Sequence, residues 1–227
     1  MEEERVSKFT VIDLFSGAGG LSKGFLDAGF DVLLGVDNDK VALSTFEFNH
    51  DGARAISLDL SDTKAFTDIE NIIGNRELDV IVAGPPCQGF SMAGKIGRTF
   101  TDDPRNHLFK EFVRIVKIVR PCFFVMENVA RLYTHNSGKT RTEIIQAFQN
   151  IGYSVECKVL NAADFGVPQI RSRVIFIGRR DKGKISFPEP FQISHQTVGS
   201  AIGHFPKLAA GESNPHVANH EAMNHSA

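Results

Sequence analysis

The chain of 227 residues has no tryptophan, only three cysteines, and no apolar run that approaches the ~20 residues of a membrane-spanning helix. Its acidic start lacks the basic and then apolar order of a signal peptide. The cysteines Cys87, Cys122 and Cys157 lie far apart and form no Cys-x-x-Cys pair, which disfavours zinc ribbons and thioredoxin-like redox sites. We therefore expect a protein of the reducing cytoplasm, with no membrane partner and no bound metal.

The bulk composition is that of an ordinary globular protein, with 42% hydrophobic and 23% charged residues. The length fits one large domain, or one domain plus a fragment of a second. A chain of this size buries enough surface to fold without disulfides or a structural metal. The net charge of −2 argues against binding nucleic acid through overall charge, although it leaves room for a local basic cleft.

Short apolar runs alternate with amphipathic segments along most of the chain. The predicted strands are residues 9–15, 32–37, 54–60, 79–83 and 122–126. The predicted helices are residues 21–28, 40–49, 64–73, 107–119 and 140–150, with a short one near 198–202. This alternation predicts an α/β fold, a doubly wound and mostly parallel sheet with helices on both faces. Two more strands, 154–160 and 173–178, are joined by a loop and indicate an antiparallel pair at one sheet edge.

A glycine-rich turn, residues 13–20, joins the first predicted strand to the first helix. Glycines there let the backbone approach a ligand at the helix N-terminus. The third glycine of the dinucleotide fingerprint is replaced by Ser22, so the match to an NAD site is poor. Acidic residues also end the next two strands, in the block 37–39 and at Asp59. Together these features favour S-adenosylmethionine, an adenosine cofactor without a pyrophosphate. Alternatively, each acid is a solvent-facing turn residue.

A possible reactive site follows the fourth predicted strand. Cys87 stands in the block 84–91 (Gly-Pro-Pro-Cys-Gln-Gly-Phe-Ser), and Glu127 ends the neighbouring strand at the same sheet edge. A thiol beside a carboxyl suits addition to an electron-poor ring whose nitrogen the acid can hydrogen-bond. Because free cysteine titrates near ~8.5, the thiolate needs electropositive help, which Arg171 and Arg173 could supply. The plainer alternatives are a structural cysteine, a capping acid and a solvated edge strand.

Five blocks together resemble the DNA cytosine-5 methyltransferase family, in particular its bacterial restriction-modification enzymes. These blocks are residues 13–20, 37–39, 84–91, 127–129 and 169–173. The resemblance implies that Cys87 attacks C6 of a cytosine flipped out of duplex DNA, while Glu127 contacts N3 and the exocyclic amine. C5 then takes a methyl group from S-adenosylmethionine, and loss of the C5 proton expels the sulfur.

The resemblance also implies roles for other residues. Arg173 would contact the cytosine O2, and Arg171 would assist near the sulfur and the DNA backbone. The implied cofactor-binding residues are Phe15, Ser16, Gly17, Ala18, Gly19, Gly20, Asp37, Asn38, Asp59, Pro86 and Leu108. The implied DNA-binding residues are Gln88, Ser91, Arg98, Arg105 and Gln169. The loop after Cys87, which contains two of these arginines, is a candidate lid that closes on DNA.

The resemblance extends to about Gly178, and the 49 residues beyond it are too few for the family's target-recognition region. We therefore expect a catalytic, cofactor-binding domain over residues 1–180, with 181–227 as a linker or the start of an absent target-recognition region. The chain would be truncated, or would be one half of a split enzyme whose second subunit recognises DNA. As a DNA-modifying enzyme it would be nucleoid-associated. The rival functions are a tRNA cytosine-5 methyltransferase, a non-catalytic DNA-associated regulatory partner and, most weakly, a hydrolase with a cysteine nucleophile.

Overall fold

The computed structural model describes residues 9–74, 77–86, 106–192, 194–217 and 219–224. The chain divides into two compact units. One unit comprises Met1–Val159 and Arg173–Phe187, and the other comprises Leu160–Ser172 and Pro188–Ala227. The predicted boundary at residue 180 remains a prediction.

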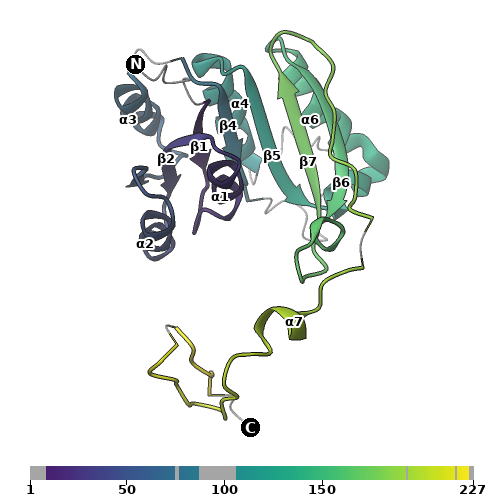
Figure 1. Cartoon of the computed structure of the whole chain (residues 1–227). Helices are drawn as coiled ribbons and strands as arrows, with labels where there is room; N and C mark the ends of the chain where they lie inside the picture. Colours follow the sequence, from purple (N-terminus) through teal and green to yellow (C-terminus); the bar gives the residue numbers. More distant parts are fainter. Residues whose placement is uncertain (1–8, 75–76, 87–105, 193, 218, 225–227) are drawn as a thin grey trace, which may run out of the picture. The chain divides into compact units, whose positions relative to one another are not determined.

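In the described residues, seven strands form one sheet in the order β3-β2-β1-β4-β5-β7-β6 (Figure 1). Their bounds are β1 (Thr10–Leu14), β2 (Asp31–Asp37), β3 (Arg54–Ser57), β4 (Val80–Ala83), β5 (Phe123–Val129), β6 (Ser154–Asn161) and β7 (Ser172–Arg179). Strands β3, β2, β1, β4 and β5 run parallel, whereas β7 pairs antiparallel with β5. The predicted mostly parallel sheet with an antiparallel strand pair near one edge is confirmed.

Helices connect the strands, as the alternating sequence pattern predicts. Their bounds are α1 (Gly20–Asp27), α2 (Lys40–Asn49), α3 (Thr63–Ile73), α4 (His107–Val119), α5 (Arg131–Thr134), α6 (Lys139–Gln149) and α7 (Val198–Ile202). Two short 3-10 helices are η3 (His135–Gly138) and η4 (Ala162–Phe165). Helices α3, α4 and α6 pack on one face of the sheet around the larger apolar core. Helices α1 and α2 pack on the other face around a smaller core.

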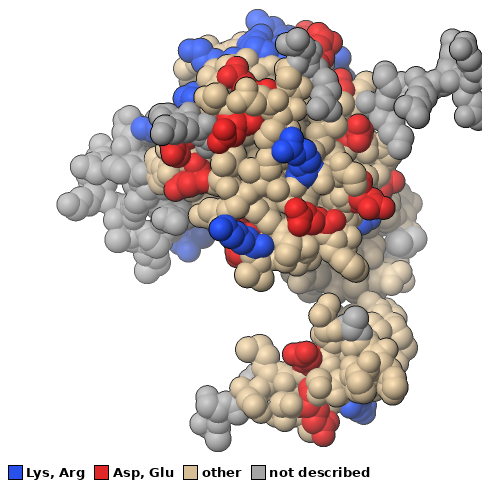
Figure 2. Space-filling view, turned by 90° about the vertical axis from the view of Figure 1, so that its left-hand side faces the viewer, with Lys and Arg blue, Asp and Glu red and all other residues tan. Residues whose placement is uncertain are grey.

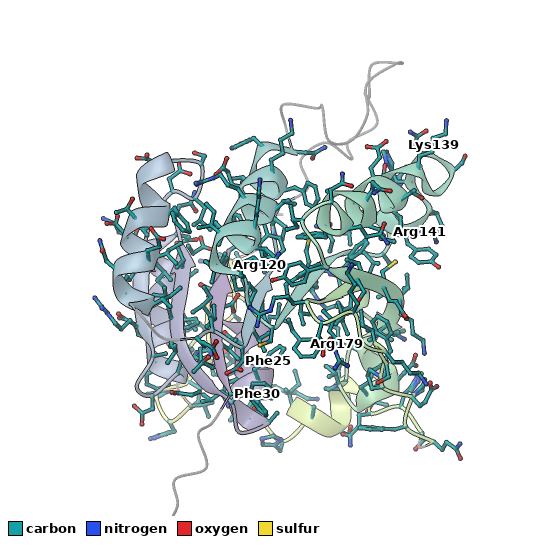
Figure 3. All side chains as sticks on the ribbon, turned by 90° about the horizontal axis from the view of Figure 1, so that it is seen from above. Phe25, Phe30, Arg120, Lys139, Arg141 and Arg179 are labelled. Carbon is teal, nitrogen blue, oxygen red and sulfur yellow. The ribbon has the colours of Figure 1, made fainter. Side chains whose placement is uncertain are left out.

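Aromatic side chains fill much of both cores. Phe124 of β5 stacks on Phe148 of α6 with ring centroids 4.0 Å apart. A Cβ on Gly178 of β7 would lie 1.8 Å from the Phe124 ring, so only glycine lets β7 pass there. On the opposite face, Phe25 of α1 meets Phe30 edge to face at 5.2 Å, which holds α1 against the sheet (Figure 3).

Two strand ends differ from the prediction by three residues, and the other strand ends by no more than one. Strand β3 ends at Ser57 rather than residue 60, because the chain turns where the Asp59 carboxylate accepts the backbone N–H of Ser61. Strand β5 continues to Val129 rather than residue 126, because β7 pairs with it as far as Arg173. Among the described helices, none is long and apolar enough to span a membrane.

Candidate active site

A cavity of about 240 Å³ opens at the carboxyl ends of strands β1, β2 and β4. Such an edge is where open α/β sheets bind ligands. The lining residues are Phe15, Asp37, Asn38, Leu58, Asp59, Leu60, Gly84, Pro86 and Leu108. Six of them are residues that the family resemblance assigns to the cofactor, although they come from five separate parts of the chain. The structure therefore brings together what the sequence keeps apart.

The glycine-rich turn is held against the end of β2 by two hydrogen bonds. The backbone N–H of Ser16 donates to the carbonyl of Val36 over 3.0 Å, and that of Gly17 donates to Asp37 Oδ2 over 2.8 Å. Phe15 and Gly17 both have positive φ, of 58° and 52°, which turns the chain away from the strand direction. Asp37 therefore shapes the turn in addition to lining the cavity.

The turn has features that a ligand would satisfy. The hydroxyl of Ser16 is buried and has no hydrogen-bond partner among the described residues. A buried polar atom without a partner is costly, and a bound ligand is one way to satisfy it. Ala18 is exposed in the turn, and Gly20 is the first residue of α1. An aromatic ring and two carboxylates line the cavity, and the adjoining turn holds the unsatisfied hydroxyl, a combination that fits an adenosine-type group.

The acids that follow β2 and β3 differ in their hydrogen-bond partners. Asp39 caps helix α2, because its Oδ1 accepts the backbone N–H groups of Val41 and Ala42. Asp59 accepts the hydroxyl of Ser61 over 2.7 Å, and the bonds from Ser61 hold the pKa of Asp59 below its usual range. Asp59 is thus an ionised acceptor at the cavity rim, whereas Asp39 is structural.

Glu127 lies beside the segment that leads into Cys87. Its Oε1 is 2.7 Å from Nε of Arg173, and both side chains are about one quarter exposed, at 27% and 26%. The two residues are diagonal neighbours across the antiparallel β5–β7 pair, which sets their spacing. A Cβ on Gly84 would lie 4.0 Å from Glu127 Oε2. The carboxylate therefore reaches the first residue of the Gly-Pro-Pro-Cys block.

Asn128 was not predicted as a functional residue, although it belongs to the Glu-Asn-Val block of the family resemblance. It is buried, and its Nδ2 donates to the carbonyl oxygen of Pro85 over 3.1 Å. This bond joins the end of β5 to the segment two residues before Cys87.

The remaining predicted residues belong to the second compact unit or fall outside the described ranges. Arg171 and Gln169 belong to the second compact unit and are exposed. There, the backbone N–H of Arg171 donates to Asn161 Oδ1 over 3.0 Å. The predicted residues outside the described ranges are Cys87, Gln88, Ser91, Arg98 and Arg105. In the part of the chain that the structure describes, no three His, Cys, Asp or Glu side chains are grouped as a metal site needs.

Comparison with known proteins agrees with this geometry. The family model for C-5 cytosine-specific DNA methylase matches residues 9–226. The Type II methyltransferase M1.HphI of Haemophilus parahaemolyticus is 62% identical over 217 residues, covering 96% of this chain and 58% of the relative. M.XorII of Xanthomonas oryzae is 42% identical over 200 residues, covering 86% of this chain and 46% of the relative. The chain thus spans about half the length of these relatives.

Among solved structures, one described as a prophage-encoded DNA modification methyltransferase of E. coli has a TM-score of 0.73 and 32% identity. The match covers 91% of this chain and 57% of the chain in that structure. On this evidence the chain belongs to the C-5 cytosine-specific DNA methylase family.

Proposed function

We propose that the chain is the catalytic part of a methyltransferase that moves a methyl group from S-adenosylmethionine to C5 of a cytosine in duplex DNA. The observation that carries the proposal is the position of Gly84. This residue lines the cavity that fits an adenosine-type group and also lies beside the Glu127 carboxylate. The cavity proposed for the cofactor and the carboxylate proposed to bind the pyrimidine thus both adjoin the residue that opens the Cys87 block.

For the cofactor, we propose that Phe15 stacks on the adenine and that Leu108 lines the same pocket. Asp37 would bind the ribose hydroxyls and Asp59 the adenine amine. The Ser16 hydroxyl, which has no partner among the described residues, would gain one. S-adenosylmethionine supplies the methyl group when it is bound. The cavity lining and the acceptor state of Asp59 support these roles.

For the reaction, we propose that the Cys87 thiolate adds to C6 of the cytosine and makes C5 nucleophilic. Glu127, as a carboxylic acid, would donate its proton to N3 and accept a hydrogen bond from the exocyclic amine, which neutralises the negative charge that the ring gains, and Arg173 would hold O2. The ion pair between Glu127 and Arg173 supports these two roles, because it places an acidic and a basic side chain next to each other. When C5, once methylated, gives its proton to a water molecule, the C6–sulfur bond breaks, the thiolate is released and N3 returns its proton to Glu127.

The proposal also covers how the chain binds DNA. The cytosine must leave the base stack, because C6 is inaccessible inside a duplex. Figure 2 shows acidic and basic side chains together on one face of the molecule, so DNA contact would depend on local groups such as Arg98, Arg105, Arg171 and Gln169. Because the chain spans 58% of M1.HphI, we include in the proposal that residues outside this sequence, in a longer chain or a second subunit, read the DNA sequence.

A covalent trapping experiment tests the proposal. The chain is incubated with S-adenosylmethionine and a mixed-sequence duplex containing 5-fluorocytosine, which blocks loss of the C5 substituent and holds the adduct. Intact mass spectrometry should show a protein–DNA adduct that Cys87→Ser abolishes and that the matched variant Cys122→Ser retains. An adduct that persists in Cys87→Ser, or one that forms only with 5-fluorocytosine tRNA, would contradict it.

A further inference from the structure

A buried polar group lies under the glycine-rich turn, apart from the proposed cofactor contacts. It consists of Asp13 on β1, Ser22 on α1 and His50 at the end of α2, each at most 1% exposed. Asp13 Oδ2 accepts the backbone N–H of Ser22 over 3.3 Å. The Ser22 hydroxyl lies 3.1 Å from His50 Nε2 and 3.2 Å from the carbonyl oxygen of Gly19.

The tautomer of His50 follows from its second contact. His50 Nδ1 lies 2.9 Å from the carbonyl oxygen of Phe46, and because a carbonyl only accepts, Nδ1 carries the hydrogen. Nε2 is therefore the ring nitrogen that faces the Ser22 hydroxyl. In the neutral ring, Nε2 can accept the Ser22 hydroxyl hydrogen.

One extra proton lets this group form an additional hydrogen bond. Without it, the single hydroxyl hydrogen of Ser22 serves one of three acceptors, namely the Asp13 carboxylate, His50 Nε2 and the Gly19 carbonyl oxygen, and the other two lose it. With a proton on Asp13, the carboxyl donates to Ser22 and Ser22 donates to His50. With the proton on Nε2 instead, the chain of hydrogen bonds runs in the opposite direction. Buried acceptors without partners are costly, so the protonated group is the better satisfied one.

The charges around Asp13 agree with a retained proton. Burial raises the pKa of Asp13 to about 7, although hydrogen bonds from the hydroxyl and the backbone N–H of Ser22 lower it, and the Asp37 charge raises it further. Strand β4 faces Asp13 with Val82, which carries no charge. The groups that act on Asp13 are therefore Ser22 of α1, Asp37 of β2 and, through Ser22, His50 of α2.

The group also sits where it can shape the turn. The His50 ring stacks on Phe46 with centroids 4.0 Å apart. A Cβ on Gly19 would lie 2.3 Å from His50 Cε1 and 2.6 Å from the Phe46 ring, so this ring pair packs directly under the turn. Gly19 has φ 83° and precedes the first residue of α1. A shift of His50 would therefore move the backbone that the cofactor is proposed to contact.

We propose that His50 is a positioning residue for the glycine-rich turn, and that one proton shared through Ser22 with Asp13 couples the shape of that turn to the affinity for the adenosine cofactor. Loss of the proton breaks the chain of hydrogen bonds that ties the start of α1 to the end of α2. Cofactor affinity then falls as the pH rises through about 7. By linkage, the bound cofactor makes the group hold its proton more tightly.

An NMR titration of the ligand-free chain tests the shared proton without any cofactor. The His50 ring nitrogens and the backbone amides of Gly19 and residue 22 should shift over one common transition in the wild type. In Ser22→Ala the two sets should titrate separately, because the hydroxyl that joins them is gone. The control is Thr140→Ala, which removes another buried hydroxyl bonded to a histidine, His135, and should keep the common transition. Separate transitions in the wild type, or a common one in Ser22→Ala, would overturn the proposal.

The coupling to the cofactor rests on the proposed function. Calorimetry with S-adenosylhomocysteine distinguishes failure of the coupling from failure of the proposed function. Its affinity for the wild type should fall roughly fivefold from pH 6 to pH 8. The affinity for Asp13→Asn should not change with pH, because that side chain cannot ionise. Measurable binding that does not vary with pH in the wild type would overturn the coupling. An absence of binding at every pH would instead contradict the proposed cofactor, while the NMR titration still decides whether the proton is shared.

Discussion

The side chain of Asn128 donates a hydrogen bond to the carbonyl oxygen of Pro85, which ties the end of β5 to the segment that carries Cys87. Because Asn128 is buried, loss of this hydrogen bond should lower the stability of the fold. Asn128→Ala should therefore lower the free energy of unfolding by about 1–3 kcal/mol. It should also slow adduct formation by Cys87, because the segment before the thiol loses its anchor.

Urea unfolding and the rate of 5-fluorocytosine trapping measure these two effects of Asn128→Ala. The control is Gln146→Ala, which removes an exposed side-chain hydrogen bond to Asn150 on the far end of α6 and should change neither quantity. If Asn128→Ala trapped DNA as fast as the wild type, the bond to Pro85 would have no part in placing the thiol.

Glu127→Gln should abolish most methyl transfer while leaving the fold intact. The amide keeps the shape of the side chain but cannot transfer a proton to N3 as the carboxylic acid does. A loss of roughly 100-fold or more in turnover is expected for a positioned acid or base. The matched control is Glu111→Gln, which breaks a similar ion pair, with Arg114 at 2.6 Å, on helix α4. Steady-state methylation rates and circular dichroism provide the comparison, and equal losses in both variants would count against Glu127.

Asp37→Ala should weaken cofactor binding by two routes. It removes a wall of the cavity and also the acceptor of the Gly17 backbone N–H. We expect the affinity for S-adenosylhomocysteine to fall about tenfold or more, which corresponds to about 1.4 kcal/mol. Asp39→Ala is the control, since this acid caps α2 instead. Calorimetry that found Asp39→Ala more damaging than Asp37→Ala would reverse the assigned roles.

The buried Asp13 predicts a pH dependence of stability. Because burial raises its pKa from 3.8 to about 7, the folded state binds the proton more tightly than the unfolded state does. The stability that Asp13 contributes is complete below about pH 4 and is lost as the pH rises to about 7. At 1.36 kcal/mol per pKa unit, the loss is on the order of 4 kcal/mol at most.

Asp13→Asn should remove this dependence, because asparagine resembles the protonated acid and does not titrate. The free energy of unfolding of the variant minus that of the wild type should therefore rise between pH 4 and pH 7 and then stay constant. Urea titrations across this range measure the difference. A difference that stays constant across this range would show that Asp13 ionises at little cost and would contradict the prediction.

Apolar periodicity in the sequence predicted most of the sheet and helices, since buried strands and amphipathic helices leave regular patterns. Helix α2 and helix α4 begin and end at the predicted residues. The end of β5 could not be predicted, because it depends on pairing with β7, whose residues lie about 45 positions further along the chain.

The candidate site was predictable where it consists of recognisable blocks, such as the glycine-rich turn and the acids at Asp37 and Asp59. The roles of Asn128 and His50 were not, because each depends on one hydrogen bond to a partner distant in sequence. Single-residue patterns hold no trace of such a partner. Ser22 was noticed only as a missing glycine, whereas the structure shows it bonded to a buried histidine.

The central claim is methyl transfer to C5 of cytosine in DNA, with Cys87 as the nucleophile. The most direct measurement is mass spectrometry of the nucleosides released from duplex DNA after incubation with the chain and S-adenosylmethionine. The account predicts 5-methyl-2′-deoxycytidine with the wild type and none with Cys87→Ser. Methylation of another base or position, or equal yields from the two proteins, would contradict it.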